Sequence, residues 1–203
     1  MNRFGQVAIA AILGAALLGL PSAPAGAVMV KIGPDGYGVD SDGRRMVSGY
    51  GRSRSYKKIK REVVKFGGNY SAGTIIVNTT ERRLYHVLGN GKAMKYGVGV
   101  GRQGFQWAGT HRITRKAEWP GWTPPPQMRR RQPGLPAYMA GGPNNPLGAR
   151  ALYIGSTLYR IHGSNEPWTI GHAVSSGCIR MTNDDVTHLY NNVKRGAKVV
   201  VVR

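Results

Sequence analysis

The sequence contains a single cysteine, Cys178, among 203 residues. One cysteine cannot form a disulfide within the chain, so the thiol is a buried apolar group, an intermolecular link or a reactive nucleophile. Acidic residues are also scarce, with nine Asp and Glu against 29 Lys and Arg. So few carboxylates disfavour a carboxylate catalyst or a calcium site. The five histidines lack the close spacing of metal ligands, so we expect no metal.

Long apolar runs are missing except near the N-terminus. Arg3 precedes fourteen apolar residues, Val7 to Leu20, a length typical of a signal peptide and short for a membrane span. Small residues at Ala25–Ala27 offer a cleavage site, and Ala23–Ala25 offers a second one. We interpret residues 1–27 as the signal peptide of an exported bacterial protein. An uncleaved membrane anchor is the alternative.

Basic residues are abundant and give a net charge of +20, which predicts a polyanionic neighbour. Nucleic acid would suit this charge, but an exported protein rarely meets it. We therefore expect no nucleic-acid partner and favour the anionic cell wall or a membrane surface.

Residues 28–72 are rich in Gly, Ser, Lys and Arg and poor in aliphatic side chains. This composition predicts a basic, solvated extension. Its most basic part, Arg44 to Lys65, either contacts the wall polyanion or is simply solvated. From residue 73 onwards the chain has the character of one folded domain, with enough residues for a core.

Short apolar or alternating runs separated by turns predict a mostly β domain, of meander or barrel-like type. Gly89-Asn90-Gly91 predicts a tight hairpin turn, because Asn and Gly tolerate positive φ. The runs expected to form strands are 74–78, 82–88, 92–100, 111–116, 151–155, 158–163 and 197–202.

One helix is predicted after residue 182, with Thr182 as its N-cap and two aspartates in its first turn. Val186, Leu189, Tyr190 and Val193 recur at helical spacing and form one apolar face. Gly196 is expected to stop the helix in a left-handed conformation.

The segment from Ala117 to Arg150 carries Trp119, Trp122 and three consecutive prolines. A long irregular segment inside a compact domain is often a lid or a groove wall. An ordered surface insertion is the alternative.

Cysteine chemistry requires a base, a group that orients the base, and amide donors for the developing oxyanion. The amides of Ser176, Gly177 and Cys178 are candidate donors, and the nearby helix start is expected to lower the thiol pKa modestly. His162 ends a predicted strand and precedes Gly163, which places it well to reach a cleft. His188 lies beside the apolar face of the helix and is expected to be structural.

The segment "YRIHGSNEPWTIGHAVSSGCIRM" resembles the active-site region of the L,D-transpeptidases, the family with a YkuD-type catalytic domain. That pattern is a histidine, about fifteen residues and then Ser/Thr-x-Gly-Cys. Here His162 is followed by Ser175, Ser176, Gly177 and Cys178, sixteen positions separating histidine from cysteine. The upstream segments "GTHRITRKAEWPGWTPP" and "GGPNNPLGARALYIG" resemble the Gram-negative branch of the family. The resemblance covers about residues 73–203.

The resemblance implies the family's β-sandwich or barrel-like fold, a periplasmic location and peptidoglycan stem peptides as substrate. Cys178 is then the nucleophile and His162 the general base and acid, oriented by the backbone carbonyl of Gly163. The thiolate attacks the third residue of a tetrapeptide stem and releases D-alanine, without a metal or organic cofactor. Carbapenem-type β-lactams are expected to acylate Cys178.

The acyl acceptor stays open. An amine of another stem gives a 3→3 cross-link, an outer-membrane protein gives a protein tethered to the wall, and water gives a carboxypeptidase or endopeptidase. Trp119, Trp122 and Tyr138 are candidates for the acceptor groove. A non-catalytic wall-binding protein is a further alternative.

The sequence departs from one common form of the family pattern, Ser/Thr-His-Gly-Cys-x-Asn. Ser176 replaces the second histidine, which leaves the backbone donor intact. Arg180 replaces the asparagine, and either it binds a substrate carboxylate or it braces the active-site loop.

Overall fold

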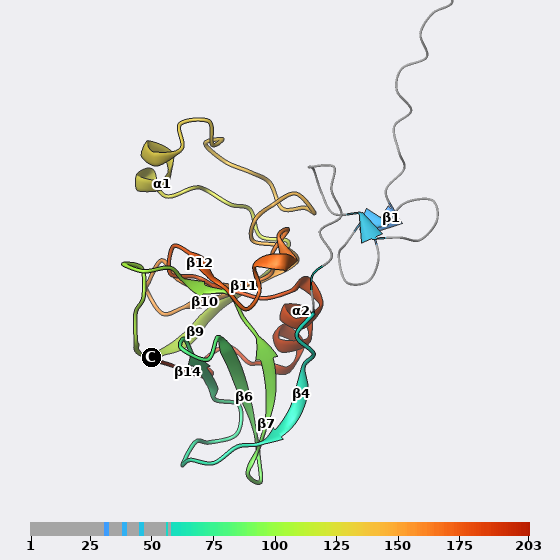
Figure 1. The fold of residues 1–203 in the computed structure, drawn as a ribbon, viewed down its shortest axis with the longest axis vertical. Helices are drawn as coiled ribbons and strands as arrows, with labels where there is room; N and C mark the ends of the chain where they lie inside the picture. The colour runs from blue at the N-terminus through green and yellow to red at the C-terminus, as the bar shows by residue number, and fades with distance from the viewer. Residues whose placement is uncertain (1–30, 33–37, 40–44, 47–55, 57) are drawn as a thin grey trace, which may run out of the picture.

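A mixed sheet of nine strands carries most of the fold (Figure 1). The computed structural model describes residues 31–32, 38–39, 45–46, 56 and 58–203. The predicted signal peptide, residues 1–27, lies outside the described residues. The strand order is β13-β11-β10-β9-β14-β5-β6-β7-β4. One core cluster takes apolar side chains from strands across this sheet and from helix α2, so the prediction of a mostly β domain is confirmed.

The elements have the following bounds. The sheet contains β4 (Glu62–Lys65), β5 (Ile75–Asn78), β6 (Arg83–Gly89), β7 (Lys92–Gly97), β9 (Gly109–Glu118), β10 (Arg150–Ile154), β11 (Arg160–His162), β13 (Ile179–Arg180) and β14 (Lys198–Val202). A second sheet pairs β8 (Val100–Gly101) with β12 (Ala173–Ser175), and a third pairs β1 (Lys31–Ile32), β2 (Gly38–Val39) and β3 (Arg45–Met46). The helices are α1 (Pro126–Arg131), the 3-10 helix η1 (Pro167–Thr169) and α2 (Asn183–Asn192).

The hairpin of β6 and β7 turns where the sequence predicts it. Gly89, Asn90 and Gly91 all have positive φ, at 91°, 51° and 65°. β6 and β7 pair in antiparallel fashion on either side of this turn. The seven predicted strands all exist, although the run 92–100 is divided between β7 and β8.

Strand β14 lies in the middle of the sheet. It pairs in parallel with β5 and in antiparallel fashion with β9. Val199 and Val201 point into the core with 0% and 2% of their surface exposed, because alternate residues of a strand face the same side. The last strand of the chain therefore joins the β5–β7 meander to the β9–β11 part of the sheet.

Helix α2 begins as predicted and ends early. The Thr182 hydroxyl accepts a hydrogen bond from the amide of Asp185 at 3.1 Å, which caps the first turn. Val186 and Leu189 are buried against the sheet. The helix ends at Asn192 because Val193 is already extended, so the expected stop at Gly196 is wrong. Gly196 has a φ of 87° but serves the following turn, where its amide bonds to Ile113 O.

Residues 58–65 do not behave as the predicted solvated extension. Strand β4 pairs with β7 as the edge of the sheet, from Glu62 opposite Lys95 to Lys65 opposite Lys92. Just before β4, Arg61 contacts Asp185 of α2 at 3.0 Å. The pairing of β4 and this ion pair hold residues that the composition alone assigns to solvent.

The segment between β9 and β10 projects beyond the strands as an arm that carries α1 (Figure 1). Two backbone hydrogen bonds between Trp122 and Met139 close the arm near its base. None of the α1 side chains is buried. Arg131, at the end of α1, lies over the Phe105 ring at 5.6 Å and connects the arm to the loop after β8. Within the described residues, no helix has the length and apolar character needed to cross a bilayer.

Candidate active site

The predicted histidine belongs to β11 and the predicted cysteine directly precedes the neighbouring strand β13, and both lie on the same face of the sheet. β11 and β13 pair in parallel, with Ile161 opposite Ile179 and His162 opposite Arg180. The two isoleucines are 0% and 1% exposed and point into the core. Because side chains alternate along a strand, His162, Arg180 and the preceding Cys178 lie on the opposite face. The pairing thus brings together residues that are sixteen positions apart in the chain.

A row of side chains crosses the sheet on this face and ends at the thiol. Arg115 of β9 is opposite Tyr153 of β10, and Tyr153 is opposite Arg160 of β11. Extending the parallel register of β11 and β13 by one residue sets Arg160 beside Cys178. The Arg115 and Arg160 guanidinium groups lie over the Tyr153 ring at 3.6 and 5.4 Å. The sequence analysis did not single out Arg160.

His162 is buried and fixed by backbone. Its Nδ1 hydrogen-bonds the carbonyl oxygen of Gly163 at 2.5 Å. A carbonyl only accepts, so Nδ1 carries the proton and Nε2 has its lone pair available. Burial, reinforced by the charges of Arg180 and Arg160, lowers the pKa of His162 to about 3, although the backbone of Gly163 and Leu147 opposes this shift. The imidazole is therefore neutral at physiological pH.

The Cys178 thiol is partly exposed and protonated at rest. Burial raises its pKa, while the charges and hydrogen bonds of Arg160 and the charge of Arg180 act in the opposite direction. The modest lowering expected from the helix start is therefore wrong, because burial outweighs the favourable charges. The thiol lies 4.0 Å from the carbonyl oxygen of Leu158, and no hydrogen bond among the described residues joins it to His162. Catalytic hydrogen bonds are often long before substrate binds.

The loop that carries the thiol is braced from both sides. The Ser175 hydroxyl donates to Cys178 O at 2.6 Å, and the Trp107 indole donates to Gly177 O at 2.7 Å. Trp107 stacks on Tyr159 with ring centroids 4.6 Å apart. Gly177 has a φ of 107°, and a Cβ there would come within 2.3 Å of the Tyr159 ring. Only glycine fits at this position.

The three candidate amide donors are not equivalent. The Gly177 amide already donates to the Ser175 hydroxyl at 3.1 Å. The amides of Ser176 and Cys178 take part in none of the hydrogen bonds recorded for residues 58–203. These two amides are therefore available to an external acceptor in a way that the Gly177 amide is not.

The remaining predicted binding residues lie elsewhere. Arg180 pairs with Glu166 at 2.9 Å, which ties β13 to the start of η1. Trp119, Trp122 and Tyr138 belong to the arm, where Tyr138 is 61% exposed and packs over Gly121. No described hydrogen bond or ring contact connects these three side chains with Cys178 or His162.

Asn183 helps to position His162 through hydrogen bonds to nearby backbone. The sequence analysis did not identify this residue. Its Oδ1 accepts from the amides of Ala149 at 2.9 Å and Ser164 at 3.2 Å. Asn183 is 1% exposed and lies at the first position of α2. It joins the segment at Ala149 to Ser164, the residue after Gly163, and thereby helps to fix the carbonyl that orients His162.

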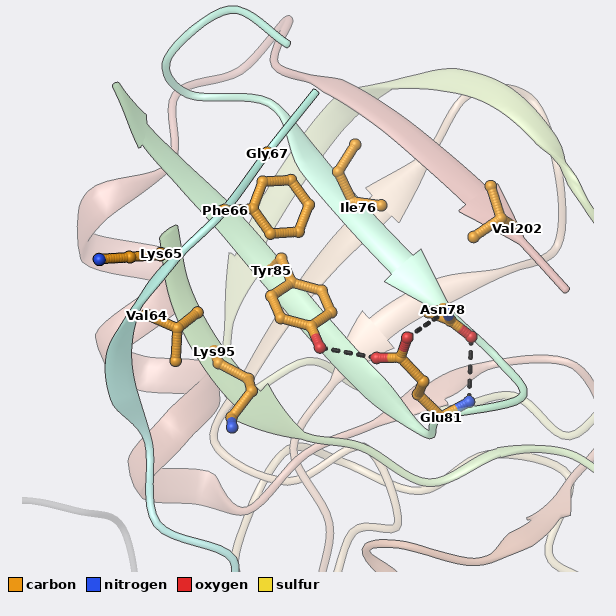
Figure 2. A pocket seen from close by; sticks show the side chains of 10 residues that line it. All are labelled: Val64, Lys65, Phe66, Gly67, Ile76, Asn78, Glu81, Tyr85, Lys95 and Val202. Atoms are coloured by element: carbon orange, nitrogen blue, oxygen red, sulfur yellow. Dashed lines mark hydrogen bonds between the residues drawn. The ribbon is translucent and has the colours of Figure 1, made fainter. Parts of the chain in front are cut away.

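A cavity of about 310 Å³ lies on another part of the molecule (Figure 2). Phe66, Tyr85, Ile76 and Val202 form its apolar wall, and the Glu81 carboxylate at its rim accepts from the Tyr85 hydroxyl at 2.6 Å. None of the predicted site residues lines this cavity. Its acidic group is already paired, so we assign the cavity no part in the chemistry.

Fold and site together define a mostly β protein with a cysteine and a histidine on the same face of two paired strands. Residues 72–201 match the family model of the L,D-transpeptidase catalytic domain, YkuD. This match covers more than half of the chain, so the chain belongs to the L,D-transpeptidase catalytic-domain family.

Individual relatives agree with this assignment. The probable L,D-transpeptidase ErfK/SrfK of Escherichia coli K12 is 42% identical over 137 residues, which are 63% of this chain and 43% of that protein. The chain thus spans less than half the length of this curated relative.

Solved structures share the fold. A crystal structure from Brucella melitensis, named as a probable carnitine operon oxidoreductase, is 43% identical with a TM-score of 0.50, covering 72% of this chain and 95% of that one. The NMR structure of the Enterococcus faecium L,D-transpeptidase catalytic domain is 20% identical with a TM-score of 0.51, covering 66% of this chain and 100% of that one. At 20% identity the second likeness concerns the fold alone.

Proposed function

We propose that the chain is an exported L,D-transpeptidase that acts on peptidoglycan stem peptides through a Cys178 acyl-enzyme. The observation that carries this proposal is the arrangement of the thiol and the imidazole. Cys178 and His162 lie on the same face of paired strands, and the Gly163 carbonyl holds His162 with Nε2 unprotonated. A neutral thiol beside a neutral imidazole suits proton transfer that accompanies attack on the substrate.

The proposed reaction has two halves. In the first, the Cys178 sulfur bonds to the carbonyl carbon of the third stem residue while His162 takes the thiol proton. The amides of Ser176 and Cys178 are the donors that we assign to the oxyanion, and Gly177 joins them only if Ser175 releases its amide. His162 then protonates the departing D-alanine, which leaves a thioester on Cys178.

In the second half, an acceptor attacks the thioester and His162 removes its proton. An amine of a neighbouring stem gives a 3→3 cross-link, and an amine of an outer-membrane protein tethers that protein to the wall. Water gives hydrolysis instead. Trp119, Trp122 and Tyr138 remain our candidates for the acceptor groove. Arg180 is already paired with Glu166, which favours its bracing role over binding a substrate carboxylate.

The location follows from the same proposal. We propose that residues 1–27 direct export to the periplasm and that the basic charge retains the enzyme at the anionic wall. The competing function is that of a non-catalytic wall-binding protein whose active site is inactive. That alternative predicts an unreactive thiol.

The first experiment measures covalent capture by a carbapenem. We expect the intact mass of the purified protein to rise by one carbapenem, because the strained lactam carbonyl acylates the activated thiol. Cys178→Ala should abolish the adduct and His162→Ala should slow its formation by about 10²- to 10⁴-fold, the range typical of a lost general base.

Ser71→Ala provides the matched control, since Ser71 is exposed and lies far from the thiol in the loop before β5. It should acquire the adduct at the wild-type rate. A wild-type protein that keeps its unmodified mass would refute the acyl-enzyme and leave the wall-binding alternative.

A further inference from the structure

Arg160 occupies an unusual position beside the nucleophile. It lies in the cross-sheet row between Tyr153 and Cys178. The strand register sets it beside Cys178, and its charge opposes the rise in the pKa of the Cys178 thiol that burial causes. Its Nε is buried and has no hydrogen-bond partner. A guanidinium held in this way leaves part of its hydrogen-bonding capacity unused, which costs stability unless another group requires it.

No carboxylate neutralises Arg160 among the described residues. Each of the six acidic side chains there is occupied by another partner: Glu62 by Lys95, Glu81 by Asn78 and Tyr85, Glu118 by Arg150, Glu166 by Arg180, Asp184 by Lys58 and Arg61, and Asp185 by Arg61. Arg180, on the same face, therefore has a counter-ion, whereas Arg160 has none among the described residues and its guanidinium lies 5.4 Å from the centre of the Tyr153 ring.

We propose that Arg160 is a catalytic residue whose guanidinium stabilises the negative charge that forms on the Cys178 sulfur. The inference rests on the proposed function, in which that charge appears during each acylation. The S–H bond breaks, its proton goes to His162, and the sulfur electron pair attacks the carbonyl carbon. Arg160 supplies the opposite charge at the sulfur, and the Tyr153 ring keeps the guanidinium over the site by a cation–π contact.

The other charged and titratable groups near the thiol act differently. His162 is neutral until it receives the proton, and its burial disfavours the charge that it then carries. Arg180 lies opposite His162, and its charge is shared with Glu166. Within the described residues, Arg160 is thus the cation that the strand register sets beside Cys178 and that has no carboxylate partner.

The experiment measures the thiol directly, without a peptidoglycan substrate. The rate of Cys178 alkylation by iodoacetamide is followed from pH 6 to about pH 11.5 in the wild type, Arg160→Met and Arg160→Lys, because the raised thiol pKa requires a range that extends above pH 10. An opposite charge in contact shifts a pKa by about one to three units. We therefore expect the midpoint of Arg160→Met to move up by at least about one unit and its alkylation rate at pH 7 to fall about tenfold. Arg160→Lys should recover part of the loss because it restores the charge.

Arg115→Met is the matched control. It removes the same charge from the same row and from the same Tyr153 ring, but two strands further from the thiol. Its alkylation profile should match the wild type. Thermal unfolding monitors the fold of each variant, and Arg160→Gln replaces the methionine variant if that one does not fold.

An Arg160→Met or Arg160→Gln profile identical to the wild type would overturn the proposal. The outcome is independent of the carbapenem experiment. A protein that forms no carbapenem adduct but shows the shifted alkylation midpoint would keep the role of Arg160 at the sulfur and reject the transpeptidase assignment. The reverse pair of results would keep the transpeptidase and reject Arg160.

Discussion

The side-chain oxygen of Asn183 links helix α2 to the two chain segments beside His162. It accepts hydrogen bonds from the amides of Ala149 and Ser164, and all three residues are buried. We expect Asn183→Ala to lower the free energy of unfolding by about 2–4 kcal/mol, because two buried amides lose their acceptor. Urea unfolding measures the loss, and carbapenem acylation should slow as the Gly163 carbonyl moves.

Asn192→Ala tests whether this cost is specific to the buried site. Asn192 ends the same helix, is exposed, and its side chain donates to His188 O at 2.8 Å. Its loss should change stability by less than about 0.5 kcal/mol. Equal effects of the two substitutions would show that Asn183 is no more than a helix residue.

The buried imidazole of His162 makes stability depend on pH. Its pKa is about 3 in the folded protein and near 6.5 in the unfolded chain. Between these two pH values His162 is protonated in the unfolded chain and neutral in the folded protein. The free energy of unfolding therefore falls as pH falls through this window. We expect the wild type to lose about 2 kcal/mol more than His162→Gln between pH 7 and pH 5, measured by urea unfolding.

Comparing two proteins isolates this contribution. His86 and His188 also have lowered pKa values, for which burial is the first cause, and their effect is common to wild type and variant. Parallel stability curves for the two proteins would mean that the folded protein protonates His162 as readily as the unfolded chain does.

Strand β4 and helix α2 are joined by an ion pair that crosses the sheet edge. Asp185 is 1% exposed, and its Oδ1 takes the Arg61 guanidinium at 3.0 Å. Arg61→Met leaves this carboxylate buried without its cation. We expect a loss of about 2 kcal/mol in the free energy of unfolding, together with faster amide hydrogen exchange in β4.

Lys60→Met is the control for this pair. Lys60 precedes Arg61, is exposed and carries the same charge. It should leave both the stability and the exchange of β4 unchanged within about 0.5 kcal/mol. A loss common to both variants would point to the general charge of the segment rather than to Asp185.

Elements with a long pattern or a defined turn are predictable from this sequence. The β6–β7 hairpin follows from Gly89-Asn90-Gly91, and α2 follows from Thr182 and its apolar spacing. β8, β12 and β13 have two or three residues each, too few to show any period. β4 cannot be predicted from the sequence, because Val63 and Val64 lie among lysines and arginines. Its strand conformation depends on its pairing with β7.

Some residues of the candidate site can likewise be predicted from the sequence and others cannot. Cys178 and His162 are found from residue type and spacing, and the Gly163 contact follows the prediction. Arg160 is one of 29 basic residues in the sequence, and nothing local distinguishes it. Its place beside the thiol depends on the register of β11 against β13. The sequence does not reveal the role of Asn183 for a similar reason, because its two hydrogen-bond partners belong to other segments.

The charge of the whole domain is distributed unevenly between paired and unpaired groups. All six acidic side chains of the described residues have partners, and most of the Lys and Arg there have no carboxylate partner. Such a surface attracts polyanions over about 8 Å at physiological salt. This property supports the proposed retention at an anionic wall.

The position of β14 also governs when the molecule becomes complete. Residues 198–202 fill the gap between β5 and β9, about 120 positions after the strand with which they run in parallel. Before these residues leave the ribosome, β5 and β9 lack the strand that pairs with both of them. The valines of β14 are then also missing from the hydrophobic core. The core of the sheet can therefore close only after residues 198–202 have been synthesised.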